Sequence, residues 1–346
     1  MAEPERTLTQ RELNRALLAR QLLLERATMP LPRAVEAMGG VQAQYAPSAY
    51  VGLWSRLAGF GREDLTRALE RRTVIQGTLM RVTIHVVSRG DYWPLALAIR
   101  EPARRWWLRT RRELSEAEIA AAAQRLREVL AHRPRSLREV SAELGARSFN
   151  GAALWAELVR VPPSGTWERR RADIYALAEQ WVGAEPKLGQ DDAVDHLVRR
   201  YLGAFGPAAR TEIAEWAGVP VSTIAPALER LRLRRFRGED GAELVDLPRA
   251  PLPDPDTPAP VRFLPTWDAT LLVHARRTQI LPERYRARVF HVRTPHSVNT
   301  FLVGGAVAGT WRYDKGRIDL DAFHPLPRLV RRELEEEAER LAAFHA

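Results

Sequence analysis

The chain contains no cysteine and only two lysines, Lys187 and Lys315. Without cysteine it can form no disulfide, no thiolate nucleophile, and no zinc or iron–sulfur site with cysteine ligands. Both lysines lie in sequences typical of exposed turns, whereas Schiff-base chemistry needs a desolvated amine. These two shortages argue against thiol chemistry and against lyase activity.

Long hydrophobic runs are missing as well. No apolar stretch approaches the length of a membrane span, and the first residues lack the charged-then-apolar order of a signal peptide. We therefore expect a cytosolic protein without a membrane partner.

The sequence also lacks the motifs of common cofactor sites. It has no phosphate-binding Gly-x-x-x-x-Gly-Lys, no dinucleotide fingerprint and no His-Glu-x-x-His. The acidic segment Asp191–His196 resembles a metal cluster, but it stands where a predicted helix begins. Helix capping and the helix dipole explain it more simply, so we expect no metal and no cofactor.

Positive charge is present in excess. The 53 basic residues outnumber the 43 acidic ones, which gives a net charge of +10, and all the basic residues except the two lysines are arginine. A genome rich in G and C explains most of the preference for arginine, but it explains the net charge less well. A large basic excess favours a polyanionic partner.

One pattern of elements recurs three times: two helices separated by a turn, then a basic strand and a hairpin. In the clearest copy, Gly218–Pro220 separates a helix over Thr211–Ala217 from a longer one over Ser222–Leu231, and strands over 232–237 and 242–247 follow. A helix-turn-helix with a hairpin is a winged helix, a fold used chiefly for DNA contact.

The other two copies are less regular. The second has a helix from Ser136 to Gly145, a helix from about Gly151 to Val159 and the turn Pro162–Trp167 before three arginines; the first has helices over Leu31–Met38 and Pro47–Leu57 and a hairpin over Thr73–Val87. In the first copy, the segment Gly39–Tyr45 lies between the two helices.

A six-proline segment, Pro248–Pro260, predicts a linker before a β-rich end. There we expect strands over Val261–Leu264, Thr270–His274, Val289–Arg293, Thr300–Val303 and Ala306–Tyr313, then a helix over Leu329–Phe344. The predicted fold class is α+β, mainly α, with winged helices over 1–100, 101–185 and 186–250 and a β-rich C-terminal domain over 261–346.

Four motifs in this order resemble the AlkZ/YcaQ family of DNA glycosylases. They are Gly40-Val-Gln-Ala-Gln44, the hairpin Thr78–His85, Pro162-Pro-Ser-Gly-Thr-Trp167 and Val307-Ala-Gly-Thr-Trp-Arg312. The resemblance covers about residues 8–328 and depends on the ordered set rather than on any single motif.

The resemblance implies three tandem winged helices and a β-rich C-terminal part, C-shaped around double-stranded DNA. It implies a monomeric, monofunctional glycosylase that hydrolyses the N-glycosidic bond of bulky N7-alkylguanines or unhooks interstrand crosslinks. Its setting would be DNA repair or self-resistance to a genotoxic natural product. The family's catalytic motif is Gln-apolar-Gln in the AlkZ branch and Gln-apolar-Asp in the YcaQ branch, so the resemblance assigns catalysis to Gln42 and Gln44 and places the chain in the AlkZ branch.

Two neutral amides suffice for this reaction because an N7-alkylated guanine is already cationic and leaves without an acid. The site must then only hold water and stabilise the sugar cation, and two amide carbonyls can do both. In an extended segment Gln42 and Gln44 point to the same side, with Ala43 pointing away. Read without the resemblance, such a pair in a loop more often bonds to backbone groups.

DNA contacts are expected from Arg81 and His85 on the first hairpin and from Arg276, Arg277, Arg312 and Lys315 near the C-terminal strands and turns. The alternatives are a solvated edge for the cations and a structural role for His85 and for His274. Trp106 and Trp107, which lie among arginines, could stack on bases or pack in the core.

A competing reading is a winged-helix transcription regulator or architectural DNA-binding protein without catalysis. Such proteins usually carry one winged helix per chain and bind palindromes as dimers. Three copies in one chain favour a curved monomer, and a regulator needs no polar pair in the turn of its first motif. Release of a base from an N7-alkylated duplex separates the two readings.

Overall fold

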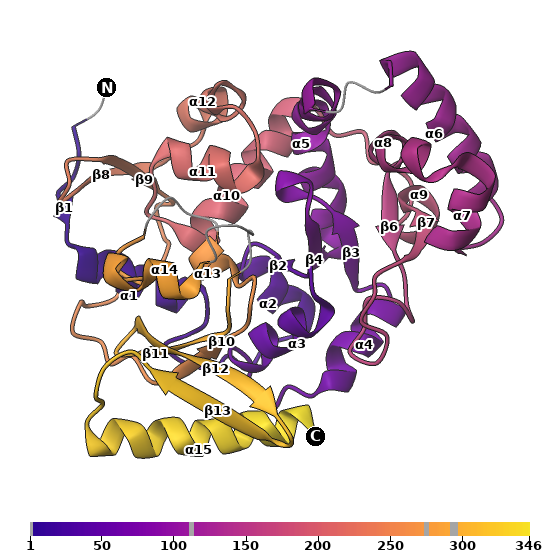
Figure 1. The fold of residues 1–346 in the computed structure, drawn as a ribbon. Coiled ribbons are helices and arrows are strands. Elements are labelled where there is room, and N and C mark those ends of the chain that lie inside the picture. The colour runs from indigo at the N-terminus through magenta and orange to yellow at the C-terminus, as the bar shows by residue number, and fades with distance from the viewer. Residues whose placement is uncertain (1–2, 111–113, 273–276, 291–296) are drawn as a thin grey trace.

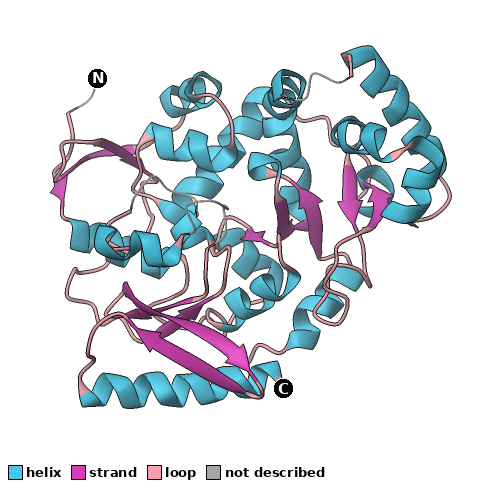
Figure 2. Ribbon diagram, in the orientation of Figure 1, coloured by secondary structure: helices cyan, strands magenta, loops and turns pink. Residues whose placement is uncertain are grey.

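The computed structural model describes residues 3–110, 114–272, 277–290 and 297–346, with the backbone alone for 146–148. Helices cluster in the upper half of the view in Figure 1, and a sheet backed by one long helix forms the base. Figure 2 shows that strands are short and scattered among helices everywhere except in this basal sheet. The fold class is α+β, as predicted.

The helices are α1 (Gln10–Arg20), α2 (Leu31–Ala37), α3 (Ala46–Trp54), α4 (Arg62–Glu70), α5 (Arg89–Thr110), α6 (Glu116–Leu130), α7 (Leu137–Leu144), α8 (Ala146–Ala156), α9 (Ala178–Trp181), α10 (Gln190–Phe205), α11 (Arg210–Ala217), α12 (Val221–Arg230), α13 (Ala269–Leu272), α14 (Arg286–Val289) and α15 (Arg328–His345). Short 3₁₀ turns occupy Met80–Val82 and Glu283–Tyr285. Within the described residues, no helix is long and apolar enough to cross a membrane.

The strands are β1 (Thr7–Leu8), β2 (Val41–Gln42), β3 (Val74–Thr78), β4 (Ile84–Ser88), β5 (Arg135–Ser136), β6 (Leu158–Arg160), β7 (Ile174–Leu177), β8 (Arg234–Gly238), β9 (Glu243–Asp246), β10 (Arg262–Leu264), β11 (Thr300–Val303), β12 (Ala306–Asp314) and β13 (Arg317–Ala322). They form sheets in the orders β1-β8-β9, β10-β11-β12-β13 and β2-β4-β3-β6-β7-β5.

The helix boundaries follow local chemistry. Ser136 begins α7 with a capping box, because its hydroxyl accepts from the amide of Glu139 and the Glu139 carboxylate accepts from the amide of Ser136. Gly218 ends α11 in the left-handed conformation that favours glycine, with φ of 73°. The elements expected over 211–247 are observed as α11, α12, β8 and β9, with boundaries shifted by one or two residues.

One sheet joins the two parts of the chain that were predicted as separate winged helices over 1–100 and 101–185. Strand β3 of the first hairpin pairs antiparallel with β6, with Gln76 opposite Arg160 and Gly77 opposite Val159. The boundary predicted at residue 100 falls inside α5, which contacts β3 and β4 of the first part and α8 of the second. We call Gly39–Tyr45, which contains Gln42 and Gln44, the glutamine segment. The hairpin β3–β4 that follows it is therefore an internal part of a six-stranded sheet.

The N-terminal strand β1 pairs with β8, which lies in the copy of the helix-turn-helix pattern over residues 211–247; we call this copy the third repeat. Thr7 and Leu8 of β1 run parallel to Arg237 and Gly238 of β8. The buried ion pair between Arg20 and Asp246, with nitrogen–oxygen distances of 2.7 and 2.8 Å, fixes the end of α1 against β9. Such a pair is costly to break from one side, because it would leave a buried charge without a partner.

The C-terminal part differs from its prediction in two places. The strand expected from Thr270 is instead helix α13, because Asp268 accepts from the amide and the hydroxyl of Thr270 and starts a helical turn. Val289, expected to begin a strand, ends helix α14. Phe290 forms only an isolated β-bridge with Ser297, and residues 291–293, like residues 273–274, lie outside the described residues. The structure adds β13, for which the sequence showed only the preceding turn.

Candidate active site

The glutamine segment leaves α2 through two glycines and enters the six-stranded sheet. Gly39 and Gly40 have φ of 71° and 87°, a region that favours glycine. A side chain at Gly39 would meet the Ala204 methyl at 3.1 Å, so α10 closes over this turn. In β2, Gln42 pairs with His85 of β4, and the amide of Ala43 donates to the Ile84 carbonyl at 2.8 Å.

Both glutamine amides bond to the β3–β4 hairpin, but they differ in burial. Gln42 is 5% exposed, and its Oε1 accepts from Arg81 Nη2 at 2.9 Å. Gln44 is exposed, and its Oε1 accepts from the backbone amide of Ile84 at 3.2 Å. Ala43, between them, is buried in the core. An amide oxygen can accept two hydrogen bonds, so each retains acceptor capacity for water.

Arg81 connects the glutamine segment to the third repeat. It lies in the turn between β3 and β4 with φ of 55°, and its Nη1 donates to the carbonyl of Trp216 at the end of α11. A Cβ on Gly218 would lie 2.8 Å from the Arg81 Cα, so only glycine allows this close approach. Burial lowers the pKa of Arg81 to about 10, which leaves its guanidinium charged at neutral pH.

His85, expected at the DNA surface, is 3% exposed. Its Nδ1 lies 3.1 Å from the carbonyl oxygen of Thr83, to which it can only donate. Burial, aided by the charge of Arg81, lowers the pKa of His85 to about 3, so the ring is neutral at physiological pH. The structure thus gives His85 the structural setting that the sequence offered as an alternative.

The other residues expected to bind DNA differ in their surroundings. Arg277 is 7% exposed, and it donates to Glu212 Oε1 at 2.9 Å and to the carbonyl of Phe205 at 3.0 Å. Its guanidinium therefore bonds within the protein, and we do not propose it as a DNA contact. Arg312 and Lys315 are exposed, on β12 and in the turn after it. Arg276 and His274 lie outside the described residues.

The acidic segment at the start of α10 is engaged by arginine. Arg230 contacts Asp195 at 2.8 Å and Asp191 at 3.4 Å, and His196 Nε2 lies 2.8 Å from Asp91 Oδ1. Among residues 3–110, 114–272, 277–290 and 297–346, no group of three histidine or carboxylate side chains could hold a metal ion.

The tryptophan pair on α5 divides between surface and partial burial. Trp106 is 42% exposed, whereas Trp107 is half-buried and approaches Gly151 of α8. Their ring centroids are 6.3 Å apart in an edge-to-face arrangement.

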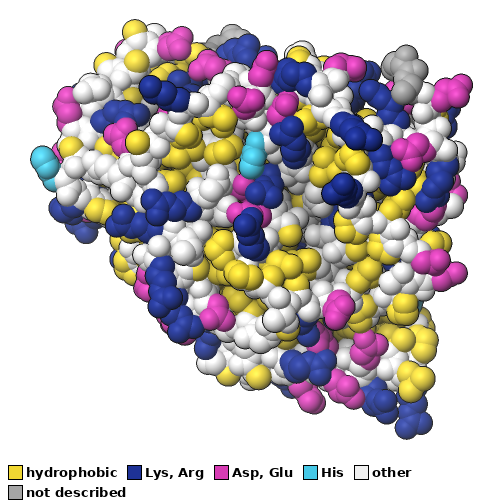
Figure 3. All heavy atoms as spheres, turned by 180° about the vertical axis from the view of Figure 1, so that it is seen from behind, with side chains coloured by type: hydrophobic (Ala, Val, Ile, Leu, Met, Phe, Trp, Pro, Cys, Tyr) yellow, Lys and Arg dark blue, Asp and Glu magenta, His cyan; other side chains and the backbone are white. Residues whose placement is uncertain are grey.

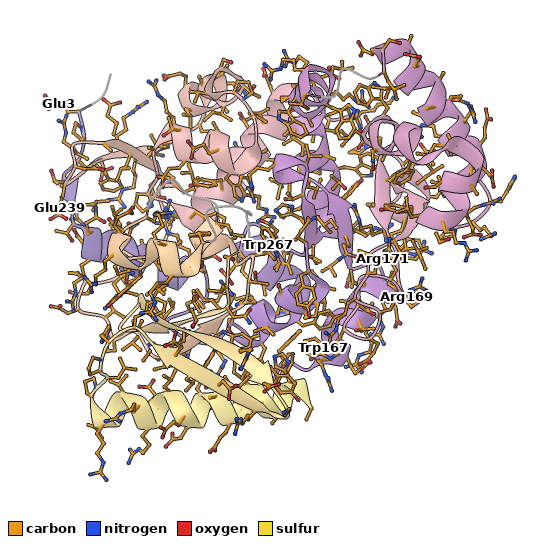
Figure 4. All side chains as sticks on the ribbon, viewed as in Figure 1. Glu3, Trp167, Arg169, Arg171, Glu239 and Trp267 are labelled. Atoms are coloured by element: carbon orange, nitrogen blue, oxygen red, sulfur yellow. The ribbon has the colours of Figure 1, made fainter. Side chains whose placement is uncertain are left out.

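Sequence reasoning missed the residues that border Gln42 from distant parts of the chain. Gln42 lines a small hollow together with Ser48 of α3 and with Trp267 and Asp268 of the loop before α13. Figure 4 labels Trp267 beside the central elements of the fold. Asp268 is held there by a buried ion pair with Arg56 at 2.9 Å. No local pattern in the sequence signals this proximity, because about 220 residues separate the two segments.

Charges are mixed on the face opposite that of Figure 1. Figure 3 shows basic side chains interspersed with acidic ones across it, around apolar areas. The basic excess of the chain is therefore not segregated on that face.

Comparison with known proteins agrees with this architecture. The family model of AlkZ-like DNA glycosylases matches residues 35–344. An interstrand DNA cross-link repair glycosylase from Streptomyces sahachiroi is 26% identical over 250 residues, which are 66% of this chain and 64% of that protein. The solved structure of the Streptomyces sahachiroi DNA glycosylase AlkZ superimposes with a TM-score of 0.82 at 18% identity, covering 98% of this chain and 97% of the other. The match of the family model over nearly the whole chain shows that this protein belongs to the AlkZ-like DNA glycosylase family.

Proposed function

We propose that this protein is a monofunctional DNA glycosylase that hydrolyses the N-glycosidic bond of bulky N7-alkylguanines in double-stranded DNA, including guanines joined across the two strands. The family and the name of the relative, a cross-link repair glycosylase, support this substrate class. The proposal extends to repair, or to self-resistance against the compound that makes the lesion.

One observation carries the assignment of the site: the two glutamine amides are fixed on one hairpin with spare acceptor capacity. Arg81 orients the Gln42 amide and the Ile84 amide orients that of Gln44. Groups oriented before the substrate arrives need no reorganisation during the reaction, and this is how positioned dipoles stabilise developing charge.

The chemistry divides between lesion and protein. Alkylation at N7 makes guanine a cationic leaving group, so the glycosidic bond breaks without a protein acid. In the proposed mechanism, the carbonyls of Gln42 and Gln44 accept hydrogen bonds from the attacking water and face the cationic sugar. The water adds to the anomeric carbon, and its proton passes to solvent, because neither amide acts as a base near neutral pH.

The proposed DNA surface uses arginine and lysine side chains that are partly or fully exposed. On β8, Arg235 and Arg237 lie on the opposite side of the strand from buried Phe236. Arg312 and Lys315 extend from β12 and its turn. Tandem winged helices curved around the duplex would bring such residues to the phosphates, where arginine bonds bidentately.

The proposal is tested by incubating the protein with a duplex that carries one N7-alkylguanine, followed by heating in alkali. We expect strand cleavage at the lesion, which reports an abasic site, and none without protein beyond spontaneous loss. Borohydride should trap no protein–DNA adduct in the wild type, Lys187→Ala or Lys315→Ala. Tight binding without base release would instead support a regulator or architectural protein.

A further inference from the structure

A second cavity, of about 250 Å³, lies beside the glutamine segment. Its walls come from six separate parts of the chain: the start of α3, the loop before β7, Pro265 after β10, Asn299 before β11, strand β12 and the end of α15. Its chemically distinctive lining residues are Tyr45, Ser48, Trp167, Trp311, Tyr313 and His345. We call it the aromatic pocket. Pockets for drug-sized ligands begin at about 300 Å³, so this smaller cavity suits one aromatic ring system of the size of a purine.

The aromatic pocket adjoins the proposed catalytic residues through the chain itself. Tyr45 follows Gln44 directly, and it is 42% exposed. Ser48 lines both the aromatic pocket and the hollow that Gln42 borders. A group held in the aromatic pocket would therefore lie next to the segment that carries the two glutamines.

Two buried polar atoms in the aromatic pocket have no hydrogen-bond partner among the described residues. They are the hydroxyl oxygen of Ser48, a residue only 3% exposed, and Nε2 of His345. Buried polar groups are normally paired, and each exception needs an explanation such as a ligand. Burial and the nearby charges of Arg170 and Arg62 lower the pKa of His345 to about 4, so its ring is neutral at pH 7 and offers one donor and one acceptor.

The remaining walls are aromatic rings. His345 stacks on Tyr313 with ring centroids 4.4 Å apart, and Trp167 meets the His345 ring edge-to-face at 5.1 Å. Trp311 is fixed by its Nε1, which donates to the carbonyl of Leu264 at 3.0 Å. At the mouth, Arg170 donates to the Tyr45 hydroxyl at 3.1 Å. In Figure 4, Trp167 lies in the interior, while Arg169 and Arg171 of the same loop extend outward.

We propose that the aromatic pocket binds a planar, hydrogen-bonding aromatic ring of the DNA substrate while Gln42 and Gln44 face the sugar. The ring is either the alkylated guanine, turned out of the helix, or an aromatic part of its adduct. Enzymes that act on a base commonly extrude it and hold it between aromatic side chains and hydrogen-bonding groups. Arg170 and Arg312, exposed at the rim, are placed for the flanking phosphates. This inference rests on the proposed function and names where its substrate is held.

Ser48→Ala tests the pocket, with Ser55→Ala on the same segment as its matched control. The Ser48 hydroxyl has no described partner, so its removal should leave the melting temperature unchanged. It should raise the protein concentration that half-saturates single-turnover excision by about threefold to tenfold. Ser55 is 0% exposed and donates to the carbonyl of Phe263, so its replacement should lower the melting temperature and leave half-saturation unchanged.

Tyr45→Ala is the second variant, because Tyr45 is exposed and its loss should not unfold the protein. Losing one stacking surface should raise the protein concentration that half-saturates excision about tenfold. Each variant is assayed on a duplex with N7-methylguanine and on one with N7-(pyridylmethyl)guanine, whose adduct ring can accept a hydrogen bond. Equal effects on both assign the aromatic pocket to the base, and an effect on the pyridylmethyl adduct alone assigns it to the adduct.

Unchanged half-saturation on both duplexes in Ser48→Ala and Tyr45→Ala would overturn the inference. If Gln42→Ala/Gln44→Ala still abolished excision in that case, the proposed function would stand without the pocket. If the glutamine variant also kept full activity, the proposed function itself would fail.

Discussion

The hairpins β3–β4 and β8–β9 occupy the same place in the repeated pattern and each carries arginine, in the turn of the first and in strand β8 of the second, yet the fold uses these arginines in opposite ways. The first is enclosed in a six-stranded sheet between β2 and β6, and Arg81 at its tip is bonded to Gln42 and to Trp216. The second lies in a three-stranded sheet with β1, and Arg237 faces solvent. What surrounds a hairpin, rather than its own sequence, decides whether an arginine bonds to groups within the protein or faces solvent.

The largest expected effect comes from the glutamines that the first hairpin orients. Single-turnover excision should fall roughly tenfold to a thousandfold in Gln42→Ala and in Gln44→Ala, as when one positioned donor or acceptor is lost from a transition state. The double variant should lose less than the product of the singles, because both amides act on one transition state. Full activity in a folded double variant would contradict the site.

Replacing the two glutamines should change the free energy of unfolding by different amounts, because Gln42 is buried and Gln44 is exposed. Gln42→Ala leaves Arg81 Nη2 without its acceptor and should lower the free energy of unfolding by about 1–3 kcal/mol. Gln44→Ala should lower it by less, since water can reach the Ile84 amide. Gln44→Asp supplies a carboxylate and should retain more activity than Gln44→Ala, with a new acidic limb in its pH profile.

Arg81→Ala should give the next largest effect and separates a positioning role from a DNA contact. If Arg81 orients Gln42, excision should fall about tenfold, while duplex affinity and its salt dependence stay unchanged. Arg81→Lys should not restore the rate fully, because an ammonium lacks the planar fork that reaches both acceptors. Weaker binding with a shallower salt slope in Arg81→Ala would show instead that the residue contacts phosphate.

The sequence predicted what depends on local pattern. The helix that begins after Ser136, the helix end at Gly218 and the strand through Phe236 all follow from neighbours within a few residues. The strand expected from Thr270 was wrong because Asp268, held by Arg56 from another part of the chain, caps a helix there.

The candidate site was predictable only in part for the same reason. The resemblance assigns catalysis to Gln42 and Gln44, which stays a prediction, whereas the hydrogen-bond partners of their amides come from the fold. The hydrogen bond of Arg81 to the Trp216 carbonyl and the cavity that Ser48 and His345 both line bring together residues more than a hundred positions apart. A single sequence carries no signal for such contacts, so exposed and enclosed arginines looked alike.

The second hairpin should give a smaller, electrostatic effect. Replacing both Arg235 and Arg237 with Ala should weaken binding to any duplex by a similar factor. It should also reduce the log–log salt slope by about one to two, because each phosphate contact releases about one counterion. Arg33→Ala is a matched control, since Arg33 is exposed on α2 and paired with Glu36 at 2.9 Å. An unchanged slope in the β8 variant would remove this hairpin from the DNA surface.

The smallest expected effect is on the pH dependence of catalysis. Because His85 is buried, the excision rate should not depend on its titration. Its pKa of about 3 in the folded protein lies below the ordinary value of 6.5, and amides do not titrate, so the excision rate should stay nearly constant from about pH 6 to 8. Stability should respond instead. As the pH falls below about 6.5 the unfolded chain takes up a proton that folded His85 refuses, so the free energy of unfolding decreases until about pH 3, by at most about 1.4 kcal/mol per pH unit. His85→Asn retains a donor for the Thr83 carbonyl and should flatten this decrease. An acidic limb near pH 6.5 in the wild-type rate that disappears in His85→Asn would mean that the ring is solvated, and that the first hairpin is as open as the second.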